Sequence, residues 1–263
     1  MNKKTNAVKR IWLIGGTSES SQLACAIAQA QIPCTVTVTT ESARSLYPDA
    51  PTLRVVVGCK DRKEIVEFVQ VEGISAILDA SHPYAVQVSQ AAIAASTELN
   101  IPYTRYERPF VKQQSNTRSL IYLNSFDTLL AGEYLLGQRV LLTIGYRFLP
   151  LFRPWQMRST LFARILPSVT ALEASLAAGF TPARLLCIRP PISVQLEKAL
   201  WQHWEISLVV TKASGSAGGE DVKQAVAAEL GIPLIIISRP EVKYPQQTSD
   251  LITALEFCRY YGD

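Results

Sequence analysis

Two glycine-rich segments, one in each half of the chain, each follow a short apolar run. Residues 11–14 lead into Gly15–Glu19 (GGTSE), and residues 208–210 lead into Thr211–Gly219 (TKASGSAGG). A buried strand that ends in glycines and hydroxyls just before a helix presents backbone N–H groups and the positive end of the helix dipole. Both segments are therefore predicted to be turns that bind anions.

The first turn is interpreted as the phosphate site of a nicotinamide coenzyme. It lacks the full G-x-G-x-x-G spacing, so taken alone it also fits a tight turn in any doubly wound fold. The residues assigned to the coenzyme here are Gly15, Gly16, Thr17, Ser18 and Glu19.

The tip of the next expected strand indicates which coenzyme is used. Sites that prefer NAD usually place an acidic residue there to hold the ribose hydroxyls. This chain has Thr39 at that point, followed by Ser42 and Arg44, which suit the 2′-phosphate of NADPH. Because Glu41 stands among them, NADPH is the expected cofactor and NADH the alternative.

The segment DASHPYA (79–85) follows the fourth expected strand, at the ligand-binding edge of an open α/β sheet. It holds His82, one of only two histidines, which could transfer a proton or bind a carboxylate. Asp79 is expected to orient His82, and Ser81 is assigned to the coenzyme. The simpler reading is a polar cap that holds the loop.

The second turn carries positive charge as well as glycines. Lys212 and Lys223 lie within and just after it, and Arg239 follows the next expected strand. A Walker A pattern is absent, so a second nucleotide site is not indicated. Arg164 flanks a β-rich segment and could reach the same ligand through a bidentate contact. The residues assigned to an anionic substrate are Arg164, Lys212, Ser214, Gly215, Gly218, Gly219, Lys223 and Arg239.

Alternating apolar strands and amphipathic helices must position these residues. Strands are expected at 11–14, 34–39, 53–57, 75–79, 101–105, 121–123, 140–143, 161–165, 184–188, 206–211 and 234–238. Helices are expected at 20–30, from about Asp61 as an N-cap, from Pro83 to about 99, and at 126–136, 169–178, 194–203, 220–230 and 249–261. Such alternation predicts parallel sheets with right-handed crossovers.

The alternation of expected strands and helices is interrupted at residues 106–120, and the crossover between two domains is placed there. The expected division is an N-terminal cofactor-binding domain, 1–107, and a C-terminal substrate-binding domain, 108–263. A length of 263 residues suits one large domain or two of about 100–150 residues each.

Composition excludes several classes of protein. The net charge of +4 does not demand a nucleic-acid partner, and no apolar stretch approaches the roughly 20 residues of a membrane span. Five cysteines without metal-ligand spacing favour neither a metal site nor a disulfide framework, so a cytoplasmic location is expected. No Ser–His or Cys–His pattern has supporting spacing. Reactive chemistry is therefore expected to come from a cofactor.

Five motifs in order along the chain carry a resemblance to a known family. GGTSES, DASHPYA, LLTIGYRFL, FARILPS and TKASGSAGG with its following lysine and IISRP resemble the precorrin-6A reductase and cobalt-precorrin-6A reductase family of cobalamin biosynthesis. The likeness spans roughly residues 11–240. One departure is Arg189-Pro190-Pro191, where the family usually has a Gly-Pro-Phe-like step.

The resemblance implies an α/β fold of two Rossmann-like domains, parallel sheets flanked by helices, with a ligand cleft between them. It implies an oxidoreductase that reduces one double bond of the precorrin macrocycle, acting on a CH–CH group with NAD(P). Transient contacts with neighbouring pathway enzymes are also expected. Metal-free and cobalt-loaded substrates are not distinguished. Two alternatives remain open: another Rossmann-type small-molecule reductase, and a non-enzymatic protein that binds a nucleotide or a tetrapyrrole.

Overall fold

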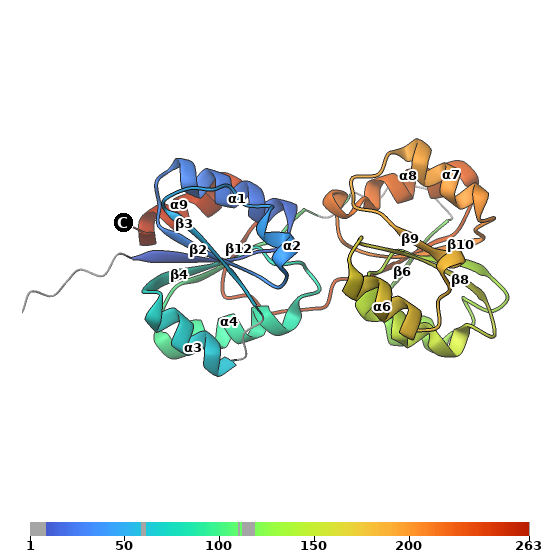
Figure 1. Cartoon of the computed structure of the whole chain (residues 1–263), viewed down its shortest axis with the longest axis horizontal. Coiled ribbons are helices and arrows are strands. Elements are labelled where there is room, and N and C mark those ends of the chain that lie inside the picture. Colours follow the sequence, from blue (N-terminus) through green and yellow to red (C-terminus); the bar gives the residue numbers. More distant parts are fainter. Residues whose placement is uncertain (1–8, 59–61, 110, 112–118, 263) are drawn as a thin grey trace, which may run out of the picture. The chain divides into compact units, whose positions relative to one another are not determined.

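The computed structural model describes residues 9–58, 62–109, 111 and 119–262. The chain forms two compact units, one of Met1–Pro109 with Glu241–Asp263 and one of Phe110–Pro240. Each unit contains a six-stranded parallel sheet with helices on both faces (Figure 1). The predicted α/β fold with two parallel sheets is confirmed.

The first unit has the strand order β12-β5-β4-β1-β2-β3. Its strands are β1 (Arg10–Ile14), β2 (Cys34–Val38), β3 (Leu53–Val57), β4 (Ile74–Asp79), β5 (Tyr103–Tyr106) and β12 (Gln247–Thr248), and its helices are α1 (Ser18–Gln29), α2 (Glu41–Arg44), α3 (Arg62–Val71), α4 (Val86–Leu99) and α9 (Leu251–Gly262). Read from β3, this is the 3-2-1-4-5-6 order of doubly wound dinucleotide-binding folds.

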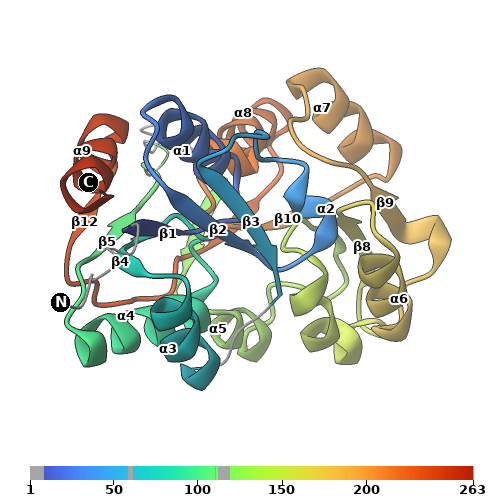
Figure 2. The ribbon, with the colours of Figure 1, turned by 60° about the vertical axis from the view of Figure 1, so that its left-hand side comes forward.

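Both faces of the central strands β1 and β4 are buried, which explains why these two strands are largely apolar. Helices α1 and α9 cover one face, where Leu23, Ile27 and Cys258 are buried against β1 and β2 (Figure 2). Helices α3 and α4 cover the other, where Trp12 packs edge-on against Phe68. Each fully buried leucine or isoleucine contributes roughly 1.5–3 kcal/mol of hydrophobic free energy.

The second unit has the strand order β6-β11-β10-β7-β8-β9. Its strands are β6 (Leu120–Leu123), β7 (Arg139–Leu142), β8 (Thr160–Ile165), β9 (Leu185–Cys187), β10 (Leu208–Lys212) and β11 (Leu234–Ile237). Its helices are α5 (Phe126–Ala131), α6 (Val169–Ala177), α7 (Val194–His203) and α8 (Glu220–Leu230), with 3-10 segments η1 (Tyr146–Trp155), η2 (Pro182–Arg184) and η3 (Ser216–Gly218). Read from β9, the order again follows the 3-2-1-4-5-6 pattern, with β6 in the sixth place.

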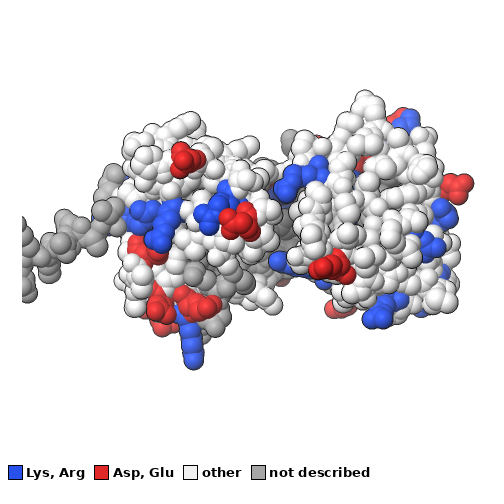
Figure 3. Space-filling model, in the orientation of Figure 1, with Lys and Arg blue, Asp and Glu red and all other residues white. Residues whose placement is uncertain are grey.

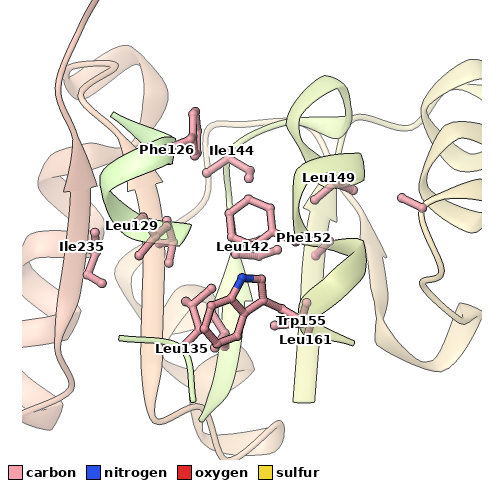
Figure 4. Packing of buried hydrophobic residues seen from close by; sticks show 14 of the residues in the cluster. Phe126, Leu129, Leu135, Leu142, Ile144, Leu149, Phe152, Trp155, Leu161 and Ile235 are labelled. Carbon is pink, nitrogen blue, oxygen red and sulfur yellow. The ribbon is translucent and has the colours of Figure 1, made fainter. Parts of the chain in front are cut away.

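The larger core of the second unit lies between its sheet and the segment η1. Phe152 and Trp155 of η1 pack with Leu142 and Leu161 of the sheet, and all four side chains are buried (Figure 4). The prolines Pro150 and Pro154 lie within η1. A second cluster beneath α7 and α8 includes Trp201 and Val226.

The C-terminal segment belongs to the first unit, which corrects the expected division at residues 108–263. Strand β12 pairs with β5, and α9 packs on α1, β1 and β4. The apolar face of α9, with Ala254 and Cys258 fully buried, is completed only by the first sheet. The expected crossover near residue 107 lies close to the observed boundary at Pro109.

Several expected boundaries were wrong in their detail. Helix α4 begins at Val86, because Pro83 lies in a turn in which the Ala85 amide bonds the His82 carbonyl. Helix α5 ends at Ala131, earlier than expected. The predicted N-cap Asp61 lies outside the described residues. Strand β12 was not predicted, since two residues carry no periodicity.

The surface is mixed in charge. On the face shown in Figure 3, Lys and Arg side chains are scattered among uncharged residues and lie beside Asp or Glu in several places. Within the described residues, no helix is both long enough and apolar enough to cross a membrane.

Candidate functional site

The expected site residues gather where each strand order reverses. In the first unit this point lies between β1 and β4, and in the second between β7 and β10. Open parallel sheets bind ligands at the carboxyl ends of the strands at such a point. The turn after β1 and the DASHPYA segment meet at the first point. The glycine-rich turn after β10 meets the turn after β7 at the second.

Thr17 ties the two loops of the first unit together. It is the N-cap of α1, and it forms a capping box with Ser20, in which each side chain accepts from the other's backbone N–H. Its hydroxyl also donates to the Ala80 carbonyl at 2.9 Å. The turn after β1 and the loop after β4 are therefore held in one fixed arrangement.

Tyr47 occupies part of the predicted phosphate turn, and the sequence did not indicate it. Its hydroxyl lies 2.7 Å from both the Gly16 nitrogen and the Ser20 hydroxyl. A Cβ on Gly15 would overlap this hydroxyl, so Gly15 is required by close packing. The amides of Gly15, Gly16 and Thr17 thus all bond within the protein.

The amides that remain at this helix start are those of Ser18 and Glu19. As the first two residues of α1, they have no acceptor inside the helix. The Glu19 carboxylate accepts from Arg108 at 2.8 Å, which offsets a negative charge that would repel a phosphate. A small hollow beside them is lined by Thr17, Glu19, Ala80, Ser81, Arg105, Tyr106 and Arg108. The structure therefore brings together the predicted residues Thr17, Glu19 and Ser81.

Asp79 is the centre of a buried polar network. Its carboxylate is fully buried and accepts from the Ser81 amide, the Ser89 hydroxyl, the Tyr103 hydroxyl and the Arg105 guanidinium, at distances of 2.6–2.9 Å. Burial, together with the adjacent carboxylate, raises the pKa of Tyr103, so this phenol stays protonated and donates. Four donors fill the acceptor capacity of one carboxylate.

Arg105 extends this network to the loop that carries the candidate site. It also bonds Glu107 at 2.9 Å and the hydroxyl and carbonyl of Ser81 at 3.0 Å, and its guanidinium lies over the Tyr244 ring. Ser81 is therefore fixed in place by Asp79 and Arg105. The signal that could have identified Arg105 is its place near the end of a strand next to β4.

His82 is bonded differently from the prediction. Within the described part of the chain, the partners of the Asp79 carboxylate do not include His82, which corrects the expected orienting role of Asp79. The Nδ1 atom of His82 accepts from the Tyr84 amide at 3.2 Å. A proton on Nδ1 would break that bond, so this loop favours the ring with its proton on Nε2.

The predicted 2′-phosphate residues lie at the exposed tip of β2. Thr39, Ser42 and Arg44 are all exposed, and Ser42 belongs to the short helix α2. The Arg44 guanidinium bonds Glu41 at 2.7 Å, with half of the arginine side chain exposed. Such exposed pairs contribute about 0–1 kcal/mol and exchange easily for another anion.

The turn after β10 is held from the inside by two side chains of α8. Glu220 accepts from the Gly215 amide at 2.9 Å, and Lys223 donates to the carbonyls of Gly218 and Gly219 at 2.8 and 2.9 Å. A Cβ on Gly218 would overlap the Ser214 hydroxyl, which explains a glycine at that position. The predicted residues Ser214, Gly215, Gly218 and Gly219 thus form one braced turn.

Three of the four predicted substrate cations have other partners. Lys223 is 1% exposed and bonds the turn's carbonyls, so it does not face a ligand. Arg164, whose side chain is 9% exposed, forms an ion pair with the buried Glu197, which also accepts from the Trp201 indole. Arg239 donates to the Ala213 carbonyl at 2.8 Å and so supports the same turn. The expectation that Lys223 and Arg164 bind substrate was wrong, because helices α7 and α8 enclose them.

Lys212, the fourth predicted cation, is half-buried at the tip of β10. Its ammonium lies 5.0 Å from the centre of the Phe148 ring, and a Cβ on Gly145 would lie 3.9 Å from it. Gly145 has a φ of +83°, which favours glycine. Because Gly145 and Phe148 follow β7, this contact joins the two turns at the point of strand reversal.

Comparisons with known proteins agree on one family. Residues 10–259 match the family model described as precorrin-6x reductase CbiJ/CobK. The chain is 45% identical to the cobalt-precorrin-6A reductase of Synechocystis sp. (97% of each chain), and 32% identical to the precorrin-6A reductase of Rhodococcus erythropolis (92% and 93%). A solved structure, CobK precorrin-6A reductase, matches with a TM-score of 0.80 and 25% identity over 97% of this chain and 98% of that one.

Proposed function

The chain belongs to the precorrin-6x reductase family CbiJ/CobK, and we propose that it reduces one double bond of cobalt-precorrin-6A with NADPH. The observation that carries the proposal is the 45% identity to a cobalt-precorrin-6A reductase along nearly the whole of both chains. Precorrins carry many carboxylates. A positively charged residue such as Lys212, at the end of β10 and the start of the glycine-rich turn, suits the binding of such a ligand. The name of that relative, cobalt-precorrin-6A reductase, also favours the cobalt-loaded substrate over the metal-free one.

The first unit suits a nicotinamide coenzyme. The amides of Ser18 and Glu19 at the start of α1 would hold its phosphate groups, because they have no acceptor inside the helix and the dipole favours an anion there. Arg108 neutralises Glu19 beside them. When bound, the coenzyme supplies a hydride. The network of Asp79 and Arg105 keeps Ser81 in place next to this position.

The choice of NADPH rests on Arg44. We expect Arg44→Ala to raise the KM for NADPH about tenfold and to leave the KM for NADH nearly unchanged, since a charged hydrogen bond contributes about 1.5–3 kcal/mol. The measurement is the ratio of kcat/KM for the two coenzymes. Arg54→Ala is the matched control, because Arg54 is also an exposed arginine paired with a glutamate, Glu72, and lies near the start of β3, away from the ligand edge. A ratio that does not change in Arg44→Ala would remove Arg44 from the coenzyme site.

His82 is the proposed source of the proton that accompanies the hydride: as an imidazolium it would give up one proton and return to the neutral ring, in which Nδ1 accepts from the Tyr84 amide. We expect His82→Ala to lower kcat about 10²-fold, at the lower end of the range for a general acid, with both KM values within about threefold of the parent. The measurement is kcat from pH 6 to 9. His203→Ala replaces the other histidine, at the end of α7, and should be neutral. Full activity of His82→Ala over this range would show that the proton comes from elsewhere.

The reaction itself is tested with purified protein under anaerobic conditions. NADPH is mixed with cobalt-precorrin-6A or precorrin-6A, and the absorbance of coenzyme and macrocycle is followed. Oxidation of NADPH only when a tetrapyrrole is present supports the proposal, and the faster substrate identifies the metal state. Binding without turnover would indicate a carrier protein. Turnover of unrelated carbonyl or olefin substrates alone would indicate a different small-molecule reductase.

A further inference from the structure

Lys223 lies at a position where a charged lysine is unfavourable for the stability of the folded protein. It is 1% exposed and occupies the first turn of α8, which begins at Glu220. Lysine is almost never fully buried without a partner, and a positive charge is unfavourable at the positive end of a helix. A side chain placed there needs contacts that offset this cost.

Those contacts are all to one turn. The Lys223 ammonium donates to the carbonyls of Gly218 and Gly219, at the end of the turn after β10. At the beginning of the same turn, the Gly215 amide donates to Glu220. Two neighbouring side chains of α8 therefore brace both ends of the turn from inside the protein. Gly219, with a φ of +66°, is bonded in a conformation that other residues rarely adopt.

The charged groups around Lys223 come from three elements. Arg164 of β8 repels its positive charge, whereas Glu197 of α7 attracts it, as do Glu220 and Asp221 of α8. Burial has the largest effect, and together with Arg164 it lowers the pKa of Lys223 to about 7. The side chain is thus mostly charged at pH 6 and mostly neutral at pH 8.5.

We propose that Lys223 is a positioning residue that keeps the turn Ser214–Gly219 in the conformation that receives a carboxylate of the tetrapyrrole, without touching the substrate itself. This rests on the proposed function for the identity of the ligand. The charged amine makes stronger hydrogen bonds to the two carbonyls than the neutral amine does. Tetrapyrrole affinity therefore falls as the pH rises through neutrality.

The variant Lys223→Met tests this, with Lys198→Met as its matched control. Lys198 is a lysine of α7 paired with Glu229 of α8, so its loss removes the same charge from the same pair of helices. Dissociation constants for cobalt-precorrin-6A and for NADPH are measured at pH 6 and 8.5. We expect Lys223→Met to weaken tetrapyrrole binding about tenfold at pH 6, to leave NADPH binding unchanged and to lose the pH dependence. The proposal is overturned if Lys223→Met weakens the binding of both ligands equally, or weakens the binding of neither.

Hydrogen exchange without ligand gives a second readout that is independent of the substrate. The amides of Gly218–Glu220 should exchange about tenfold faster in Lys223→Met than in the parent, with β7 and β10 unchanged. If the variant does not fold, hydrogen exchange of the parent protein at two pH values is the test. After correction for intrinsic exchange, the same amides should lose protection between pH 6 and 8.5. Unchanged protection in either comparison overturns the proposal. A parent that protects this turn as expected but does not bind a tetrapyrrole contradicts only the proposed function.

Discussion

Asp79→Ala is expected to destabilise the first unit by about 3–5 kcal/mol. The carboxylate lies in the middle of a buried network, and Arg105 beside it is 1% exposed. Removing one partner of a buried ion pair leaves the other charge buried and incompletely paired, at a cost of this size. The donors on Ser89 and Tyr103 also lose their acceptor. The measurement is urea unfolding, with hydrogen exchange of β1 and β4 reporting on this unit alone.

The matched variant is Asp79→Asn, which keeps the shape of the side chain. Its carbonyl oxygen can still accept from Arg105 and the Ser81 amide, and its amide can donate to the hydroxyls of Ser89 and Tyr103, which are able to reverse. We expect it to lose less than half as much stability as the alanine variant. A loss below about 1 kcal/mol in Asp79→Ala would mean that water replaces the carboxylate, and that the network does not hold Ser81.

Lys212→Ala is expected to raise the KM for the tetrapyrrole about tenfold or more, with the KM for NADPH unchanged. Lys212 is the half-buried cation at the tip of β10, and its ammonium lies near Gly145 and the Phe148 ring. A charge-assisted hydrogen bond to a carboxylate contributes about 1.5–3 kcal/mol, or 10- to 100-fold in affinity. Steady-state kinetics with each substrate varied in turn provides the measurement.

Two further variants define what Lys212 does. Lys212→Arg keeps the charge and should recover most of the affinity, and Lys198→Ala removes an exposed lysine of α7 and should have no effect. Raising the ionic strength should weaken the parent more than Lys212→Ala, because screening acts on the charge. An unchanged KM for the tetrapyrrole in Lys212→Ala would exclude Lys212 as the carboxylate ligand.

The local elements could be predicted because their signals are local. Leu53–Val57 and Val194–His203 have the expected bounds, since strand and helix periods differ and the helix starts with a capping serine, Ser193. The two glycine-rich turns were recognised in the same way, from glycines and hydroxyls between an apolar run and a helix. Predicted element boundaries were wrong where a turn sets the end of the element, as at Pro83.

The roles of the charged side chains could not be predicted, because they depend on what covers each helix and strand. Lys212 and Lys223 are equivalent as lysines near a glycine-rich turn. The fold leaves the first at a strand tip and encloses the second behind that turn, where only the carbonyls of Gly218 and Gly219 are available. Arg164 is enclosed in the same way by Glu197 of α7. Tyr47 gave no signal at all, since its contact with Gly16 spans 31 positions of sequence.

By itself, the sequence determined the alternation of strands and helices, the glycine-rich turns and the family. Each of these depends on the order and spacing of neighbouring residues. The tertiary structure alone decided that the C-terminal helix α9 completes the first unit, and which basic side chains neighbouring helices enclose. Burial and ion pairing are long-range properties, since they require side chains from distant segments to meet and exclude water. A lysine beside a glycine-rich turn is therefore left at a strand tip or enclosed behind the turn according to the segments that surround it.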